Sequence, residues 1–203
     1  MPGLVWVAVV YLLGSIPSAL LAGWWLRRID LREFGSGNLG ATNVYRVLGA
    51  RAALAVLAFD IAKGAVPVLL FPRWTTGPGA SLWPMAYGVA AIVGHIRPLY
   101  LGGKGGGKGV ATATGVFFAL APMPMLLAVA VWSAVLALTR YVSLASVSAA
   151  FALPVAVAIW YGTRPPLFAG SVAVAAFVLW THRANMERLR RRTEPLLGAR
   201  RTP

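Results

Sequence analysis

A glycine-rich segment with two lysines, LGGKGGGKG at 101–109, interrupts a chain that is otherwise strongly apolar. Glycine lets backbone N–H groups approach a ligand closely, and a run of such groups before a helix that begins near Val110 favours binding of an anion such as phosphate. The segment differs from a nucleotide-binding P-loop because Gly109 stands where Ser or Thr would ligate magnesium, which disfavours a nucleotide hydrolase. The alternative is a flexible turn whose lysines reflect only the excess of basic residues in the cytoplasmic loops of membrane proteins.

A second polar segment, GSGNLGATNVYR, has the same character. Ser36, Asn38, Thr42 and Asn43 supply hydrogen-bonding side chains, and Arg46 supplies a guanidinium group that can hold a phosphate through two hydrogen bonds. Ser, Asn and Thr also cap helices, so a purely structural role is the alternative. Two phosphate-suited segments together predict either one large anionic ligand or two ligands that meet.

A third polar segment, THRANMERL, follows the last apolar stretch and places His182, Asn185 and Arg188 at a spacing of three. The other histidine, His95, precedes Lys104 by nine residues, so it can share a site with the glycine-rich segment. A histidine near a helix end is also common as a satisfied interfacial residue, and that alternative stays open.

Acidic residues are scarce, and none of them forms a cluster with the spacing of a magnesium or zinc site: Asp30, Glu33, Asp60, Glu187 and Glu194. We therefore expect no metal and no cofactor, which disfavours metal-dependent prenyl-diphosphate and CDP-alcohol chemistry. The chain contains no cysteine, which excludes disulfides and thiolate sites. Asp60 and Lys63 form an i, i+3 pair inside an apolar stretch, where a structural salt bridge is the favoured interpretation and a functional role is the alternative.

Composition predicts that an all-α polytopic membrane protein positions these segments. The chain is 59% hydrophobic and only 12% charged, and apolar runs of about 20 residues recur. Prolines at 122 and 124 separate two of the runs, which could also form one kinked helix. We expect seven transmembrane helices near 3–25, 47–71, 81–100, 110–124, 125–139, 141–161 and 166–182.

The basic residues predict an orientation with the N terminus outside and the C terminus cytoplasmic. Only Arg73 and Arg164 then lie on outer loops, and nearly all other lysines and arginines fall in cytoplasmic segments at 26–46, 101–109, 139–140 and a tail near 183–203. The net charge of +14 therefore indicates topology more than nucleic-acid binding, and we expect the tail to contact anionic lipid heads. No linker divides the chain, so we expect a single domain over 1–203.

Taken together, the three polar segments resemble the bacterial acyl-phosphate:glycerol-3-phosphate acyltransferase family of small integral membrane enzymes. The resemblance rests on GSGNLGATNVYRVLG, GHIRPLYLGGKGGGKGVATATG and HRANMERLRRRTE, together with SIP at 15–17 and DIAKG at 60–64. This chain departs from the family's usual pattern in Arg97 before proline and in a glycine core that is one residue longer. Lys104 and Lys108 are therefore both candidates for a single role, and the resemblance favours Lys104 as the residue that binds glycerol phosphate, because its offset from His95 matches the family.

The resemblance implies that a fatty acyl group passes from acyl phosphate to the 1-hydroxyl of sn-glycerol 3-phosphate, as the first acylation step of phospholipid synthesis. It places this reaction at the cytoplasmic face of the bacterial inner membrane, with lysophosphatidic acid and phosphate as products. The expected partners are the two substrates and membrane lipids, with no nucleic acid and no obligate protein partner. The implied catalytic residues are Ser36, His95 and Asn185. Glycerol 3-phosphate would be held by Ser36, Arg46, His95, Lys104 and Asn185, and acyl phosphate by Gly37, Asn38, Thr42, Asn43, Gly103, Gly105, Gly106, Gly107 and Lys108.

Several alternatives remain open at the level of sequence. His95 could act as the general base, or an oxygen of acyl phosphate could take the proton while His95 only orients the substrate. Ser36 could instead form an acyl-enzyme. A transporter of an anionic metabolite would also use glycines and basic residues, but it predicts polar groups through the bilayer midplane. An acyl-CoA-dependent transferase is disfavoured because Tyr100 stands where an HxxxxD motif would have its aspartate.

Overall fold

The computed structural model describes residues 2–76, 79, 81–163 and 166–198, so Arg164 and tail residues 199–203 lie outside the described part. Within that part the regular structure consists of α-helices and short 3-10 turns, with one isolated bridge between Pro2 and Thr76 and no strand. This confirms the all-α prediction. The chain forms two compact units, residues 1–119 and 120–203. The expectation of a single domain stays a prediction.

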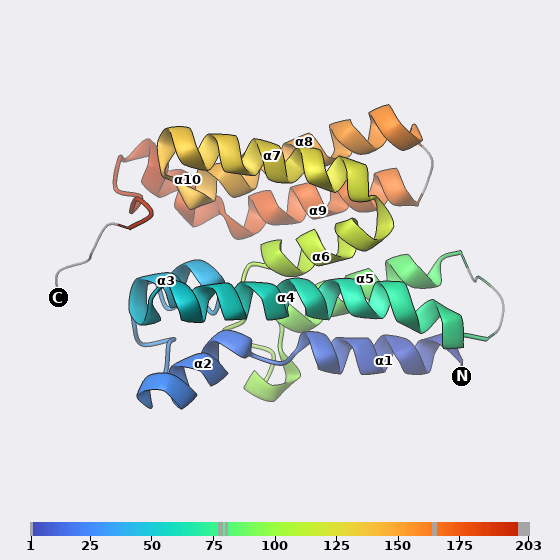
Figure 1. The fold of residues 1–203 in the computed structure, drawn as a ribbon, viewed down its shortest axis with the longest axis horizontal. Helices are drawn as coiled ribbons and strands as arrows, with labels where there is room; N and C mark the ends of the chain where they lie inside the picture. The colour runs from blue at the N-terminus through green and yellow to red at the C-terminus, as the bar shows by residue number, and fades with distance from the viewer. Residues whose placement is uncertain (1, 77–78, 80, 164–165, 199–203) are drawn as a thin grey trace. The chain divides into compact units, whose positions relative to one another are not determined.

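The first unit is built from six helices, and α5 packs against both α1 and α4 (Figure 1). The short helix α3 precedes α4 and packs against it, and α2 contacts both of them. A 3-10 turn at Phe71–Trp74 follows α4. The helices are α1 (Gly3–Gly14), α2 (Ser18–Arg27), α3 (Ala41–Leu48), α4 (Ala50–Leu70), α5 (Trp83–Ile96) and α6 (Val110–Leu120).

Glycines allow the helices of the first unit to approach closely. A Cβ at Gly14 of α1 would overlap the carbonyl of Ala91 in α5, and a Cβ at Gly115 of α6 would overlap the carbonyl of Ile61 in α4. In an apolar bundle, such small-residue contacts gain packing energy because the backbones themselves can touch. The pairs α1–α5 and α4–α6 are therefore held by residues that sequence hydropathy does not distinguish from the rest.

The predicted span at 3–25 corresponds to the apolar stretch Gly3–Arg27, but this stretch is two helices and not one. The chain leaves the helical path between α1 and α2, at Ser15, Ile16 and Pro17. Proline has no N–H to donate, and its ring disfavours helical conformation in the residue before it. Within the break the Ile16 carbonyl accepts from the Ser18 N–H at 3.0 Å, and it also accepts from the Lys63 side chain, which matters for the site described below.

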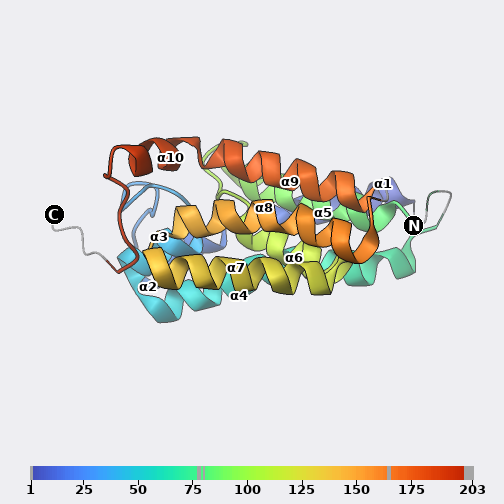
Figure 2. The same ribbon diagram turned by 90° about the horizontal axis from the view of Figure 1, so that it is seen from above.

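The second unit consists of α7 (Pro122–Thr139), α8 (Val142–Tyr161), α9 (Leu167–Thr181) and α10 (Arg183–Arg190). Helix α8 packs against both α7 and α9, and α10 bends from α9 by 55° (Figure 2). The predicted boundary between helices at 124 and 125 lies instead at Ala121. The reason is that Pro122 occupies the first helical position of α7, where a missing N–H costs nothing.

Four helical stretches in the described residues are long and apolar enough to cross a membrane, and a fifth results if α9 and α10 count as one bent span. They include Gly3–Arg27 and Ala50–Trp74 in the first unit and α7 and α8 in the second. Helices α5 and α6 have only 14 and 11 residues. The predicted count of seven spans therefore stays a prediction.

Candidate functional site

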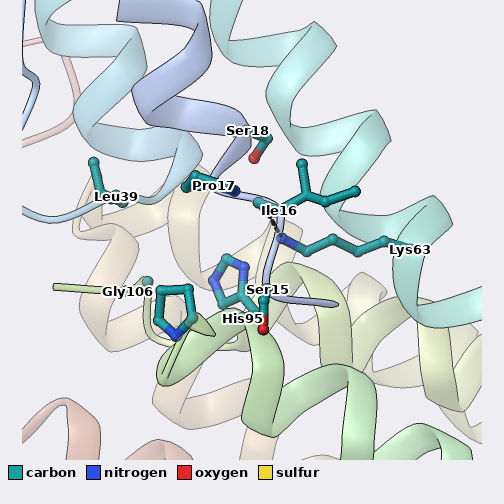
Figure 3. A pocket seen from close by; sticks show the side chains of 10 residues that line it. Ser15, Ile16, Pro17, Ser18, Leu39, Lys63, His95 and Gly106 are labelled. Carbon is teal, nitrogen blue, oxygen red and sulfur yellow. Dashed lines mark hydrogen bonds between the residues drawn. The ribbon is translucent and has the colours of Figure 1, made fainter. Parts of the chain in front are cut away.

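A small pocket opens in the first unit where the break between α1 and α2 faces α4, α5 and the glycine-rich segment (Figure 3). Its wall combines apolar residues and glycines with the polar side chains of two serines, a lysine and a histidine. The lining residues are Ser15, Ile16, Pro17, Ser18, Leu39, Lys63, His95, Pro98, Gly106 and Gly107.

His95 stands at the end of α5 and is buried, with 7% of its surface exposed. The glycine-rich segment folds directly over it, since the N–H of Gly107 donates to the carbonyl of His95 at 3.2 Å. A Cβ at Gly107 would overlap the imidazole Nε2, so only glycine leaves that nitrogen accessible from the pocket. The structure thus brings the predicted histidine and the predicted phosphate loop into one wall.

The turn between His95 and the glycines is held by side chains that donate hydrogen bonds to its backbone carbonyls. The Tyr11 hydroxyl of α1 donates to the carbonyl of Arg97 at 2.8 Å, and the Arg97 side chain donates to the carbonyl of Gly103 at 3.3 Å. Gly105 and Gly109 have φ values of 73° and 80°, a region that other residues enter only with strain. These contacts shape the loop ahead of α6, with backbone amides available at the helix N-terminus.

The first polar segment lies beside this loop. Leu39 lines the pocket, and Leu101, which precedes the glycines, packs against the apolar cluster that contains Leu31 and Leu39. A Cβ at Gly105 would lie 3.5 Å from Cδ of Arg32. The two phosphate-suited segments of the first unit are therefore neighbours in space, as the sequence predicted.

Asn43 holds the first polar segment in shape. Its buried side-chain amide donates to the carbonyls of Leu31 and Phe34 at 3.3 and 3.0 Å, and its Oδ1 accepts from the Ser36 N–H at 2.8 Å. A Cβ at Gly35 would overlap that same Oδ1. Asn43 therefore contributes to the site through the conformation of the segment that carries Ser36.

The other predicted residues of the first unit are not among those that line the pocket. Ser36 and Lys104 are exposed, and Arg46 is half-buried in the last turn of α3. Lys108 is half-buried, and Gly37, Asn38, Thr42 and Gly103 are also partly accessible. Among the described residues, the pocket lining includes His95, Gly106 and Gly107 of the predicted set.

Asn185 belongs to the second unit, where it is buried in α10. Its Nδ2 donates to Oε1 of Glu194 at 2.7 Å, and Nε of Arg188 donates to Oε2 of the same carboxylate at 2.7 Å. Burial acts to raise the pKa of Glu194, but the hydrogen bonds from Asn185 and Arg188 outweigh it and hold the pKa below its ordinary value. Glu194 thus stays ionised and fixes the orientation of the Asn185 amide.

The segment that carries Glu194 is also attached to the α7–α8 turn. The N–H of Leu197 donates to the carbonyl of Arg140 at 2.8 Å, and the Arg140 guanidinium donates back to the carbonyl of Leu197 at 3.1 Å. The segment after α10 therefore packs against the α7–α8 turn of the same unit at Leu197.

Sequence reasoning did not place Ser15, Ser18 and Lys63 in the site. The Asp60–Lys63 pair was interpreted as structural, and SIP and DIAKG entered only as matches to a family pattern. Those two stretches are the available signal, because they contain the break beside the pocket and Lys63, which lines the pocket and pairs with Asp60.

Comparisons with known proteins agree with this geometry. The family model described as glycerol-3-phosphate acyltransferase matches residues 4–192. The chain is 47% identical to a glycerol-3-phosphate acyltransferase of Synechococcus sp. (strain CC9902), over 95% of this chain and 94% of that protein. It is 45% identical to the protein of the same description from Geobacter sulfurreducens, over 94% of this chain and 95% of that protein.

A solved structure has the same fold. The crystal structure of PlsY, an integral membrane glycerol 3-phosphate acyltransferase in its glycerol 3-phosphate form, superposes with a TM-score of 0.86 at 35% identity. The match covers 97% of this chain and 96% of that one. A second form of PlsY, with lysophosphatidic acid, gives a TM-score of 0.85. With its apolar helices, this chain is a multi-pass integral membrane protein, and it belongs to the glycerol-3-phosphate acyltransferase family.

Proposed function

We propose that this protein transfers a fatty acyl group from acyl phosphate to the 1-hydroxyl of sn-glycerol 3-phosphate, the first acylation step of phospholipid synthesis. The observation that carries the proposal is the glycine-rich loop folded over the buried His95, with a pocket beside the imidazole. A phosphate-binding loop in contact with a proton acceptor suits the attack of a hydroxyl on an activated acyl group. The family description supplies glycerol 3-phosphate as the acceptor.

The reaction needs no external activation, because acyl phosphate is already a mixed anhydride. The glycerol oxygen forms a new bond to the acyl carbonyl carbon, and the bond from that carbon to the phosphate oxygen breaks with its electron pair going to phosphate. The hydroxyl proton passes to Nε2 of His95 and then to the departing phosphate. The protein contributes the alignment of two anions and the stabilisation of the negative charge that develops on the carbonyl oxygen.

The basic side chains of the site are assigned to the two phosphates. Arg46 and Lys104 bind the phosphate of glycerol 3-phosphate, and Ser36 and His95 orient its glycerol. The role expected for Asn185, which belongs to the second unit, stays a prediction. Acyl phosphate lies against amides and side chains of the two loops: Gly37, Asn38, Thr42, Asn43, Gly103, Gly105, Gly106, Gly107 and Lys108. No metal or other cofactor takes part in this scheme.

The donor assignment follows from the kind of groups that surround the pocket. A glycine loop with lysines suits a compact phosphate head, whereas the HxxxxD pair of acyl-CoA transferases has no counterpart, since Tyr100 stands in the aspartate position. The apolar helices around the site suit an acyl chain that stays in the membrane.

The proposal includes a topology for the whole chain as one domain. Seven spans, with the N terminus outside and the C terminus cytoplasmic, would place the basic loops and the tail on the cytoplasmic side of the bacterial inner membrane. The acyl phosphate and the product would then enter and leave through the lipid, and anionic lipid heads would contact the tail. The scheme requires no nucleic acid and no protein partner.

The donor is tested with labelled glycerol 3-phosphate and purified protein in a lipid phase. Palmitoyl phosphate and palmitoyl-CoA are supplied in separate reactions, with and without EDTA, and labelled lysophosphatidic acid is measured. We expect product from palmitoyl phosphate alone, unaffected by EDTA. Product from palmitoyl-CoA alone would overturn the donor assignment, and loss of activity in EDTA would overturn the metal-free scheme.

A further inference from the structure

A buried charged cluster of Asp60, Lys63, Ser18 and His95 connects α2, α4 and α5. Of these residues, Figure 3 shows Ser18, Lys63 and His95. Asp60 and Lys63 of α4 form an ion pair at 2.8 Å, with only 1% and 4% of their side chains exposed. The Ser18 hydroxyl of α2 donates to Oδ1 of Asp60 at 2.7 Å. Nδ1 of His95 lies 3.7 Å from this same oxygen.

The second contact of Lys63 fixes the cluster to the helix break. Its Nζ donates to the carbonyl of Ile16 at 3.1 Å, and that carbonyl, which lies in the break between α1 and α2, also accepts from the Ser18 N–H at 3.0 Å. The ammonium group thereby offsets the charge of Asp60 while lining the pocket itself. Ser18 and Lys63 together hold the Asp60 carboxylate in one orientation beside the imidazole.

A purely structural ion pair is a poor explanation for this arrangement. Removing two charges from water is costly, and a hydrophobic pair of similar volume usually serves stability at least as well. In the described part of the chain, Oδ2 of Asp60 is buried without a hydrogen-bond partner, whereas Oδ1 faces Ser18, Lys63 and His95 together. The cluster is organised around the oxygen that faces the histidine.

We propose that Asp60 is a positioning residue that acts through His95, an inference that rests on the proposed function. The negative oxygen beside Nδ1 keeps the ring proton on that nitrogen, so that Nε2 carries the lone pair. Nε2 is the nitrogen next to Gly107 and the pocket. In this tautomer it accepts the proton of the glycerol hydroxyl, or a hydrogen bond from it, without any rearrangement of the ring.

Kinetics of single and double variants separate positioning from structural support. Asp60→Asn removes the charge and leaves Lys63 uncompensated, whereas Asp60→Asn with Lys63→Met removes both charges and relieves that imbalance. We expect kcat to fall about 100-fold in both, with a smaller change in KM for glycerol 3-phosphate. Recovery of wild-type kcat in the folded double variant would show that the pair is only structural and would overturn the inference.

The exposed pair Glu187–Arg191 offers a matched control. Its atoms lie 2.7 Å apart, but its side chains are 48% and 72% exposed. Glu187→Gln also removes a carboxylate that faces a basic partner, and we expect it to leave kcat unchanged. An equal loss of kcat in Glu187→Gln would contradict a specific role of Asp60.

The tautomer can be measured without turnover. The chain has only two histidines, so ¹⁵N-labelled histidine and a His182→Gln variant assign the resonances of His95. We expect the neutral ring of the wild type to carry its proton on Nδ1, and the double variant to lose that preference. A proton on Nε2 in the wild type would overturn the inference. A wild type that forms no lysophosphatidic acid would instead overturn the proposed function, while the tautomer would still decide the role of Asp60.

Discussion

Gly107 carries the sharpest steric requirement at the scale of single residues. Its backbone lies against Nε2 of His95, and a Cβ there would overlap the ring. We expect Gly107→Ala to displace the imidazole and to lower kcat/KM about 100-fold, the usual cost of misplacing a catalytic group by about 1 Å. Initial rates measured beside circular dichroism of the same preparation would check this, and wild-type rates in a folded variant would refute it.

Glu194 is expected to make the stability of the protein depend on pH, because two hydrogen bonds keep the pKa of its carboxyl below the ordinary 4.5. A lowered folded-state pKa stabilises the protein above the unfolded value, and this stabilisation is lost as the pH falls through the folded value. We expect Glu194→Gln to lose about 2 kcal/mol near neutral pH, the value of a hydrogen bond to a charged group. The difference from wild type should vanish in acid.

Thermal unfolding of wild type and Glu194→Gln from about pH 7 down to about pH 3 tests this expectation. Glu187→Gln serves as the control, because that carboxylate is half-exposed. A difference in melting temperature that stayed constant with pH would mean that the charge of Glu194 is not the source of its effect.

The sequence identified the residue types of the site better than their contacts. The glycine-rich loop and His95 were expected to share a site, and the structure places Gly107 against the imidazole. The contact of Ser18 with Asp60 spans 42 positions along the chain and depends on how α2 meets α4. No periodicity reports such a tertiary pairing, so Asp60 could be recognised only as a buried charge that needs a partner.

The break between α1 and α2 matters most at the scale of elements. Hydropathy predicts one helix there, because it reports only that the stretch is apolar and does not detect an interruption of the helix within it. Pro17 disfavours helical conformation in the residue before it, and the carbonyl of Ile16 in the break accepts from Lys63 at 3.1 Å as well as from the Ser18 N–H. The same property of hydropathy explains why α5, with 14 residues, could be expected as a longer span at 81–100.

Substitution of Pro17 tests this element. Pro17→Ala allows the helix to continue through the break, which withdraws the Ile16 carbonyl from Lys63 and shifts Ser18 away from Asp60. We expect turnover to fall about 10-fold or more, with slower amide exchange at 15–18. Pro122→Ala is the matched control, since Pro122 is an exposed first residue of α7 and its loss should change little. Unchanged turnover in Pro17→Ala would separate the break from the site.

For the molecule as a whole, the question is which side of the membrane each end faces. In the first unit, aromatic residues gather at one end and an arginine–tryptophan contact lies at the end of α2. Trp6, Phe71 and Trp74 pack together at the end that follows α4, with Trp6 and Phe71 ring centroids 4.5 Å apart. At the end of α2, Arg28 lies over the ring of Trp24 at 4.7 Å. Tryptophan is typical of both membrane–water interfaces, whereas arginine favours the cytoplasmic one.

The orientation is directly testable because the chain has no cysteine. Exposed positions Thr76 and Glu33 lie in loops expected on opposite sides, so single Thr76→Cys and Glu33→Cys variants give clean labels. In intact spheroplasts we expect a membrane-impermeant maleimide to label Thr76→Cys at once and Glu33→Cys only after permeabilisation. The reverse pattern would invert the topology and move the basic loops outside.

The central claim is that the loops form one site that binds both substrates, where an acyl group passes from acyl phosphate to the 1-hydroxyl of glycerol 3-phosphate. The most direct measurement is simultaneous quantification of inorganic phosphate and lysophosphatidic acid from palmitoyl phosphate, with and without glycerol 3-phosphate. The account predicts that both products appear in equal amounts and only when both substrates are present. Phosphate released without glycerol 3-phosphate, or no release from a folded preparation, would contradict it.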